Sequence, residues 1–180
     1  IKACEEIIGN IPQVGVFDTG FHQTMPEKAY TYPISSEIAE KYKIRRYGAH
    51  GTSHRFVSEE MIKLLDMPAE ETKIITCHIG CGFLGVTHGY SSDSRDLEKS
   101  IAENDEHKPD AVRATSVMAY QIQKYIGSYT AAMNGLDAVV FTAGMGENNP
   151  ELRERVCTGM EYFGIKLNKD VNAVTHHQSK

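Results

Sequence analysis

The strongest constraint on the fold is a long amphipathic helix pattern followed at once by an apolar strand pattern. Between residues 110 and 133, apolar or small side chains recur at steps of three and four, which predicts a helix with one buried stripe: Ala111, Ala114, Met118, Ile122, Tyr125, Tyr129 and Ala132. Asn134 and Gly135 then mark its end, because both tolerate the left-handed backbone conformation. Residues 137–142 follow without polar alternation, which is typical of a strand covered on both faces.

The rest of the chain continues this alternation of strands and helices. Residues 13–17 and 73–78 have strand patterns, and helix patterns lie near residues 34–42 and 53–65. Residues 21–33 are aromatic, polar and broken by proline, so we expect an ordered loop there. A cap, a first-turn proline and an acid at residues 149–151 begin another helix. This order predicts an α/β fold with a largely parallel sheet.

Composition and charge exclude several classes of partner. The chain has 180 residues, 41% hydrophobic and 24% charged, as soluble globular proteins do. Its net charge of −5 is spread along the chain, and no Lys/Arg run predicts nucleic-acid binding or a membrane patch. No apolar run is long enough to cross a bilayer, and we expect no membrane partner. The first residues lack a leader pattern and the four cysteines lack disulfide-framework spacing, so we expect a cytoplasmic protein with reduced thiols.

Two segments place glycines directly after a predicted strand. They are residues 76–82 and residues 142–148, and the second runs into a predicted helix. Glycine lets bare backbone N–H groups approach an anion, and a helix N-terminus adds a favourable dipole. Neither segment is a P-loop, because no Gly-Lys-Ser/Thr follows. One such glycine pair is typical of a tight turn, but two in one small α/β unit favour a nucleotide site.

A basic segment and an isolated aspartate are further candidates for the site. Residues 45–55 hold three arginines and two histidines without an acid, which suits either a phosphoryl clamp or a solvated basic turn capped by Ser53. Asp18 follows an apolar strand pattern, where a carboxylate could hold Mg²⁺ or simply begin a turn. Cys77 and Cys81 flank His78, but their spacing matches no zinc pattern, so we predict no metal site made of protein ligands alone.

Several stretches together resemble the acetate kinase family. Residues 16–26 and 45–54 resemble its two signature segments, and the strand ending at His78, residues 91–96 and residues 141–148 follow in the family's order. The resemblance covers most of residues 10–170. It implies an actin-like ATPase fold, related to ribonuclease H, with two α/β domains hinged over the nucleotide. On this basis residues 1–20 are the end of the first domain and the hinge, and residues 21–180 are the second, nucleotide-binding domain.

The resemblance also implies an activity and residue roles. The activity is reversible transfer of the ATP γ-phosphate to acetate, giving acetyl phosphate and ADP, with Mg²⁺ and in a homodimer. Asp18 would be the essential active-site carboxylate, and His50 would stabilise the transferring phosphoryl group. The residues that would line the ATP site are His78, Ile79, Gly80, Cys81, Gly82, Asp93, Ser94, Arg95, Gly144, Met145, Gly146, Glu147 and Asn148.

Physical chemistry refines the role of Asp18. Acetate has a pKa of about 4, close to that of Asp and Glu side chains, so it is ionised at neutral pH and needs no general base. We therefore expect Asp18 to organise Mg²⁺ and the donors around the phosphate, with catalysis by positioning and charge neutralisation. A propionate or butyrate kinase, and a nucleotide-binding fragment without catalysis, are the alternative functions.

Departures from the family pattern predict an internal gap near residues 80–83. The family has Gly-Asn-Gly after the strand-end histidine, whereas Cys81 is the middle residue here. The family then continues for several dozen residues, including an arginine-bearing loop, but residues 82–86 lead straight to a much later segment. Its first domain and C-terminal return are missing as well. The sequence either joins the ordered pieces of a longer chain or carries a true deletion, and the chain as written is predicted to be inactive.

Overall fold

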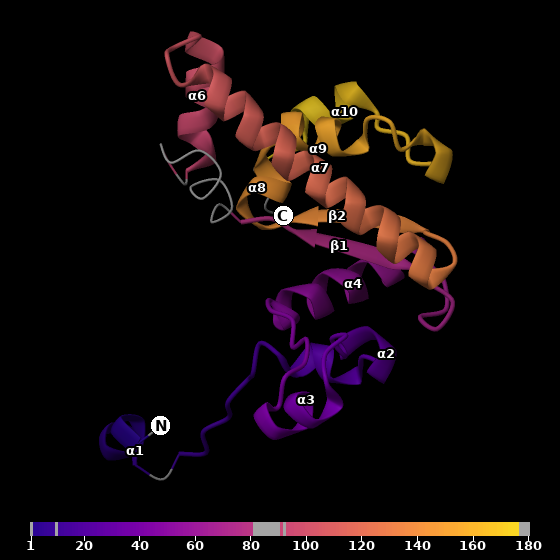
Figure 1. The fold of residues 1–180 in the computed structure, drawn as a ribbon. Coiled ribbons are helices and arrows are strands. Elements are labelled where there is room, and N and C mark those ends of the chain that lie inside the picture. The colour runs from indigo at the N-terminus through magenta and orange to yellow at the C-terminus, as the bar shows by residue number, and fades with distance from the viewer. Residues whose placement is uncertain (1, 10, 81–90, 92, 177–180) are drawn as a thin grey trace. The chain divides into compact units, whose positions relative to one another are not determined.

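The computed structural model describes residues 2–9, 11–80, 91 and 93–176 (Figure 1). The chain divides into two compact units, Ile1–Phe56 and Val57–Lys180, and each is described by itself. In the described residues, no helix is long and apolar enough to cross a membrane.

The first unit consists of short helices joined by extended segments. Its elements are α1 (Lys2–Ile8), the 3₁₀ helix η1 (Gly20–Thr24), α2 (Glu27–Tyr30), α3 (Ser36–Tyr42) and the first residues of α4 (Gly51–Leu65). The helix near residues 34–42 is confirmed. The ordered loop predicted for residues 21–33 is wrong in part, because η1 and α2 occupy much of it.

The strand predicted for residues 13–17 is wrong. This segment forms no strand, and Val14 has 87% of its surface exposed. A strand pattern becomes a strand only when a neighbouring strand accepts and donates its backbone hydrogen bonds. The described part of this unit supplies no such neighbour.

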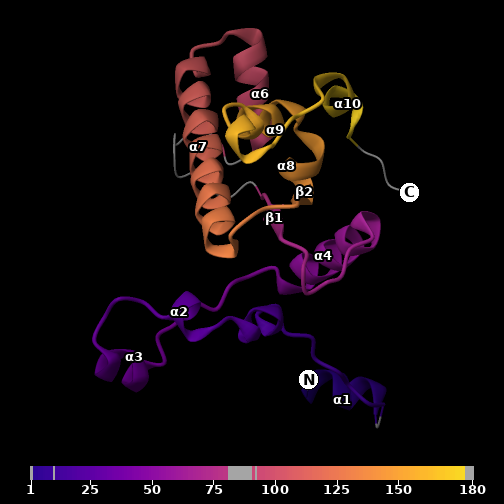
Figure 2. The same ribbon diagram turned by 90° about the vertical axis from the view of Figure 1, so that its right-hand side faces the viewer.

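The second unit is built on two parallel strands, as the sequence predicted. β1 (Ile74–His78) pairs with β2 (Ala138–Thr142) from Ile74 opposite Ala138 to His78 opposite Thr142. The helices are the rest of α4, α6 (Ser94–Glu103), α7 (Lys108–Met133), α8 (Ala143–Asn148), α9 (Pro150–Cys157), η2 (Glu161–Phe163) and α10 (Lys169–Val174). α7 packs on β1, α6 and α9, and α10 packs on α9 (Figure 2).

The predicted long helix exists, but part of its predicted buried stripe is wrong. α7 ends where expected, with Asn134 at φ 54° and Gly135 at φ 140°. Ala111, Ala114 and Met118 are buried, whereas Tyr125 is 60% exposed and Tyr129 and Ala132 are also exposed. Ile126 and Thr130 are buried instead, because the stripe continues in steps of four residues beyond Met118.

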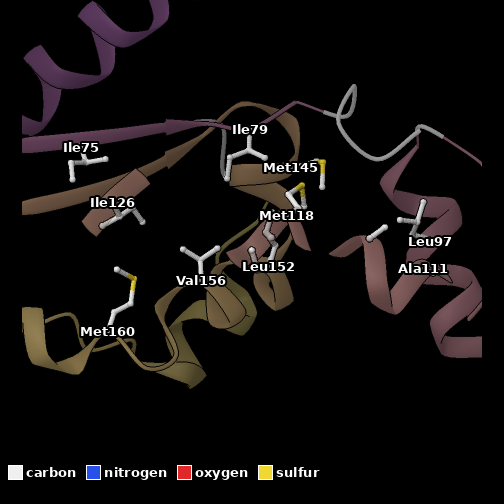
Figure 3. Close-up of a cluster of buried hydrophobic side chains, with 12 residues drawn as sticks. Ile75, Ile79, Leu97, Ala111, Met118, Ile126, Met145, Leu152, Val156 and Met160 are labelled. Carbon is white, nitrogen blue, oxygen red and sulfur yellow. The ribbon is translucent and has the colours of Figure 1, made fainter. Parts of the chain in front are cut away.

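The core of this unit lies between β1, α7, α8 and α9. Ile75, Met118, Ile126, Leu152 and Val156 are among the buried side chains that pack together there (Figure 3). This core fixes α8 and α9 directly beyond the end of β2. The glycines of residues 143–148 predict a loop before the next helix, and this prediction is wrong, because these residues form the short helix α8.

Candidate functional site

The carboxyl ends of the two strands are linked by backbone hydrogen bonds. The N–H of Ile79 donates to the carbonyl of Thr142 at 3.1 Å, and the N–H of Met145 donates to the carbonyl of Ile79 at 3.2 Å. His78, Ile79 and Gly80 therefore lie beside residues 142–146 at one end of the sheet. Two of the segments predicted to line an ATP site are thus neighbours in space.

Glycines at this sheet end differ in what surrounds them. Among the described residues, no heavy atom would lie within 4 Å of a Cβ atom added at Gly80 or Gly144. A Cβ added at Gly146 would lie 3.3 Å from the carbonyl oxygen of Cys77 and from the carbonyl carbon of Phe141. Gly146 is therefore needed for packing, whereas Gly80 and Gly144 are exposed and have open space beside them.

The backbone also turns sharply where β2 leads into α8. Ala143 has φ 63°, in the left-handed region that non-glycine residues rarely adopt. At the other end of α8, Asn148 donates from Nδ2 to the carbonyl of Gly144 at 3.0 Å. Asn149 then caps α9, because its Oδ1 accepts from the N–H of Leu152 at 2.8 Å, as the sequence predicted.

Asp93, Ser94 and Arg95 form the start of α6. Asp93 is the N-cap, with its Oδ1 accepting from the N–H of Arg95 at 2.9 Å. The Arg95 guanidinium pairs with the same carboxylate at 2.5 Å. These hydrogen bonds from Arg95 lower the pKa of Asp93 to about 2. Asp93 therefore caps α6, and the Arg95 side chain is paired with this neighbouring carboxylate.

A cavity of about 300 Å³ lies between α6, α7 and α9. Glu98 accepts a hydrogen bond of 2.5 Å from Asn149 at its edge, and burial, together with the charges of Glu151 and Asp93, raises the pKa of Glu98. The cavity is lined by Glu98, Ile101, Ala102, Thr115, Met118, Asn149, Glu151, Leu152 and Arg155. None of these residues was predicted to line a site, because only the packing of three separate helices creates the space.

In the first unit, Asp18 and His50 are in direct contact. The backbone N–H of His50 donates to Asp18 Oδ2 at 2.6 Å, and the N–H of Gly51 donates to the Asp18 carbonyl at 2.9 Å. A Cβ at Gly51 would lie 2.1 Å from that carbonyl oxygen, so only glycine fits there. His50 itself has φ 54°. Two segments that the resemblance marked as signatures therefore meet at these residues.

Two arginines of the basic segment stack on tyrosines of the same unit. The Arg45 guanidinium lies 3.9 Å from the centre of the Tyr30 ring, and the Arg46 guanidinium lies 5.2 Å from that of Tyr32. The N–H of Arg46 also donates to the carbonyl of Tyr30 at 2.8 Å. Such cation–π contacts order the segment that leads to His50.

The predicted site residues fall into two groups by unit. Asp18 and His50 belong to the first unit, and the residues predicted to line an ATP site belong to the second. Cys81 and Gly82 lie outside the described residues. Within the described ranges, no group of three or more His, Cys, Asp or Glu side chains could hold a metal ion.

Sequence reasoning missed Arg153, which is buried beneath α8. Its guanidinium donates to the carbonyls of Gly146 and Glu147. The available signal was its place on α9, since residues 152, 153, 156 and 157 form the buried stripe of that helix.

Comparison with known proteins gives one consistent family. The model of the acetokinase family matches residues 1–83 and 81–180. The acetate kinase of Thermoanaerobacterium thermosaccharolyticum is 40% identical over 234 residues, covering 97% of this chain and 58% of the relative. That of Thermotoga maritima is 39% identical over 236 residues with the same coverage. The chain thus spans less than two thirds of the length of these relatives.

Solved structures agree with the sequence relatives. The acetate kinase of Porphyromonas gingivalis has a TM-score of 0.90 at 34% identity, and the match covers 99% of this chain and 59% of that structure's chain. A propionate kinase from Francisella tularensis has a TM-score of 0.82 at 27% identity, covering 96% and 59%. The predicted α/β, actin-like ATPase fold is therefore confirmed. With matches of the family model along the whole sequence and relatives at about 40% identity, the chain belongs to the acetokinase family.

Proposed function

We propose that this chain carries the nucleotide-binding part of an acetate kinase, which reversibly transfers the ATP γ-phosphate to acetate to give acetyl phosphate and ADP. The observation that carries the proposal is the joined end of β1 and β2, where in the described residues a Cβ atom added at the exposed Gly80 or Gly144 would meet no heavy atom within 4 Å. The family and the names of the relatives agree with it. A propionate kinase among the similar structures keeps longer acyl substrates as an alternative.

The phosphates of the nucleotide belong, in this proposal, beside the open backbone at Gly80 and Gly144. The residues predicted to line the ATP site are 78–82 and 144–148, which contain these two glycines, and 93–95. Glu98 and Asn149, which line the cavity, follow residues 93–95 and 144–148 closely in the chain. The cavity volume of about 300 Å³ is at the lower end of ligand pockets. It offers space for the apolar part of a bound nucleotide.

Asp18 and His50 are the proposed catalytic residues. Mg²⁺ in nucleotide enzymes is typically held by one or two carboxylates together with substrate phosphates. Asp18 fits this role, because it is an exposed carboxylate whose position is fixed by the N–H of His50. A bound Mg²⁺ would supply charge neutralisation at the phosphates. The imidazole of His50 would add a further donor to the transferring group.

The domain division and an internal gap near residues 80–83 belong to the same proposal. The alignment with the first relative is 234 residues long although the chain has only 180, so at least 54 positions of the relative have no counterpart here. The two matches of the family model meet at residues 81–83. These observations also favour the second candidate function, ATP binding without phosphoryl transfer by the chain as written.

Three measurements separate these proposals. Intact mass comes first, because a mass well above 20.0 kDa would show that the working protein contains residues absent from this sequence. Calorimetry with ATP and Mg²⁺ then tests binding, and a coupled assay with acetate, propionate and butyrate tests transfer. Normal turnover of acetate by a verified 180-residue chain would overturn the proposed inactivity, and absence of ATP binding would overturn both functions.

A matched pair of glycine variants tests the proposed position of the nucleotide. Gly144→Ala adds a methyl group into open space, so we expect an unchanged melting temperature but ATP affinity reduced by about tenfold or more. Gly127→Ala lies within α7, where the new methyl group would make an ordinary contact of 3.7 Å with Phe163. Equal ATP affinity in both variants would place the nucleotide elsewhere.

A homodimer and a cytoplasmic location complete the proposal. α7 exposes Tyr125 and Tyr129, whose rings stack at 6.1 Å, and aromatic side chains of this kind are enriched at protein interfaces. Cys4, Cys77 and Cys157 are free thiols, as is usual in a reducing compartment. Sedimentation velocity checks the dimer, and a monomer mass at micromolar concentration would contradict it.

A further inference from the structure

Arg153 is a buried charge with no carboxylate among its hydrogen-bond partners in the described residues. Only 6% of its surface is exposed, and burial lowers the pKa of its guanidinium. The group donates five hydrogen bonds, and four of the acceptors are backbone carbonyls: Gly146, Glu147, Asn172 and Thr175. The fifth is the side chain of Asn172, whose Oδ1 lies 2.7 Å from Nε. All the donor capacity of the guanidinium is therefore used.

These carbonyls come from the last turns of two helices. Gly146 and Glu147 belong to the end of α8, and Asn172 and Thr175 belong to the end of α10. The last carbonyls of a helix lack partners within the helix and carry the negative end of its dipole. A guanidinium placed between two such ends is stabilised without an acidic residue. This explains how the charge is tolerated inside the unit.

Asn172 completes the connection. Its side chain is buried, and its Nδ2 donates to the carbonyl of Pro150 at 2.8 Å while Oδ1 accepts from Arg153. Arg153 and Asn172 thereby join the end of α8, the start of α9 and the end of α10. Lysine could not reproduce this arrangement, because its three donors radiate from one nitrogen and cannot span two helix ends.

α8 is also held by the strands. The N–H of Met145 donates to Ile79, and Gly146 packs against the backbone of Cys77 and Phe141. α8 is a single short helix between these contacts and the Arg153 guanidinium. Removing the guanidinium would leave the carbonyls of Gly146 and Glu147 without these hydrogen bonds, so α8 and Gly144 within it would become less firmly held.

We infer that Arg153 is a positioning residue that holds α8 in the conformation required for nucleotide binding. This inference rests on the proposed function, because it assigns α8 to the nucleotide site. A segment that is already fixed binds its ligand without a further ordering cost. Arg153 acts through the backbone of Gly146 and Glu147, and it does not itself touch the nucleotide.

Variants matched in stability separate positioning from simple destabilisation. Arg153→Lys and Arg153→Gln remove the bridge between the helix ends. Val156→Ala on the same helix opens a small cavity in the core but leaves the α8 carbonyls bonded to Arg153. ATP affinity is measured by calorimetry at a temperature where melting curves show all variants folded. We expect about a tenfold or greater loss for both Arg153 variants and a change within about twofold for Val156→Ala.

Hydrogen exchange gives a second readout that needs no ligand. We expect the amides of Met145 and Asn148 to exchange at least about tenfold faster in the Arg153 variants than in Val156→Ala, with equal rates in β1. Equal exchange and equal ATP affinity in the two kinds of variant would overturn the inference. Failure of the unmodified chain to bind ATP would instead overturn the proposed function, and the exchange comparison alone would then decide whether Arg153 positions α8.

Discussion

The backbone N–H of His50 and the carboxylate of Asp18 are joined by a 2.6 Å hydrogen bond across 32 residues of chain. This contact gives the aspartate a structural task that is independent of any ligand. It holds His50 at φ 54°, a conformation that is unfavourable for a residue with a side chain. The two residues proposed for catalysis are thus coupled through the backbone, and their variants should separate stability from chemistry.

Replacement of His50 by glycine should stabilise the first unit relative to replacement by alanine. Glycine adopts positive φ without a steric penalty, so we expect the free energy of unfolding to be higher in His50→Gly than in His50→Ala by about 1 kcal/mol. Urea unfolding followed by tyrosine fluorescence measures this difference. Both variants should lower kcat by about 100-fold or more wherever the protein turns over acetate, because both lack the imidazole. Equal stability of the two variants would contradict the backbone argument.

Asp18→Asn and Asp18→Ala should differ in stability, but wherever the unmodified protein turns over acetate, both should lack phosphoryl transfer. Asparagine retains an oxygen that can accept from the His50 N–H, whereas alanine leaves that donor without its partner. Since the site is exposed, we expect Asp18→Ala to cost about 1 kcal/mol and Asp18→Asn less. Both remove the carboxylate proposed to hold Mg²⁺, so neither should transfer phosphate. Mg²⁺-dependent transfer at the normal rate by Asp18→Asn would show that the charge is not required.

The cap of α6 should weaken at low pH. The pKa of Asp93 in the folded protein, about 2, lies below its ordinary value of 3.8, so the ionised form favours the folded state. This contribution is complete above about pH 4 and is lost as the pH falls toward 2. The amide resonance of Arg95, followed by NMR, should titrate with a midpoint near 2, and Asp93→Asn should abolish the transition. A midpoint near 4 would mean that Arg95 does not hold the carboxylate in solution.

The described cysteines should react with thiol reagents at very different rates. Burial raises the pKa of Cys77 to about 12 and also raises that of Cys157, whereas Cys4 is exposed. Because the thiolate is the reactive form, we expect Cys4 to be labelled at least about 100-fold faster than the other two at pH 8. Peptide mass spectrometry assigns each label, and denaturant should make the three rates similar. Rapid labelling of Cys77 in the folded protein would show that β1 opens readily.

The elements that the sequence predicted well are those set by local chemistry. The end of α7 follows from Asn134 and Gly135 alone, and the cap at Asn149 depends on a residue three positions away. The strand β2 follows from the apolar run at residues 137–142. Each of these features is encoded within a few residues, so periodicity and capping rules identify it.

The elements that the sequence did not reveal depend on distant partners. Residues 13–17 have a strand pattern, but no described strand pairs with them. The acceptors of Arg153 are carbonyls of two other helix ends, and a backbone carbonyl leaves no mark in the sequence. The cavity beside Glu98 likewise arises only when three helices pack. The assignment of Asp18 and His50 came from family resemblance, and their contact was visible only in three dimensions.

The two-stranded sheet in the described part of the chain affects how the protein associates with other molecules. In the described residues, β1 and β2 pair with each other and with no third strand, and the outer edge of β2 presents a row of backbone donors and acceptors. Such a row accepts any compatible extended segment, including one from another molecule. Residues of the first relative that have no counterpart in this chain are candidates to cover this edge. Without such a cover, self-association through strand addition should limit how concentrated the protein can be kept.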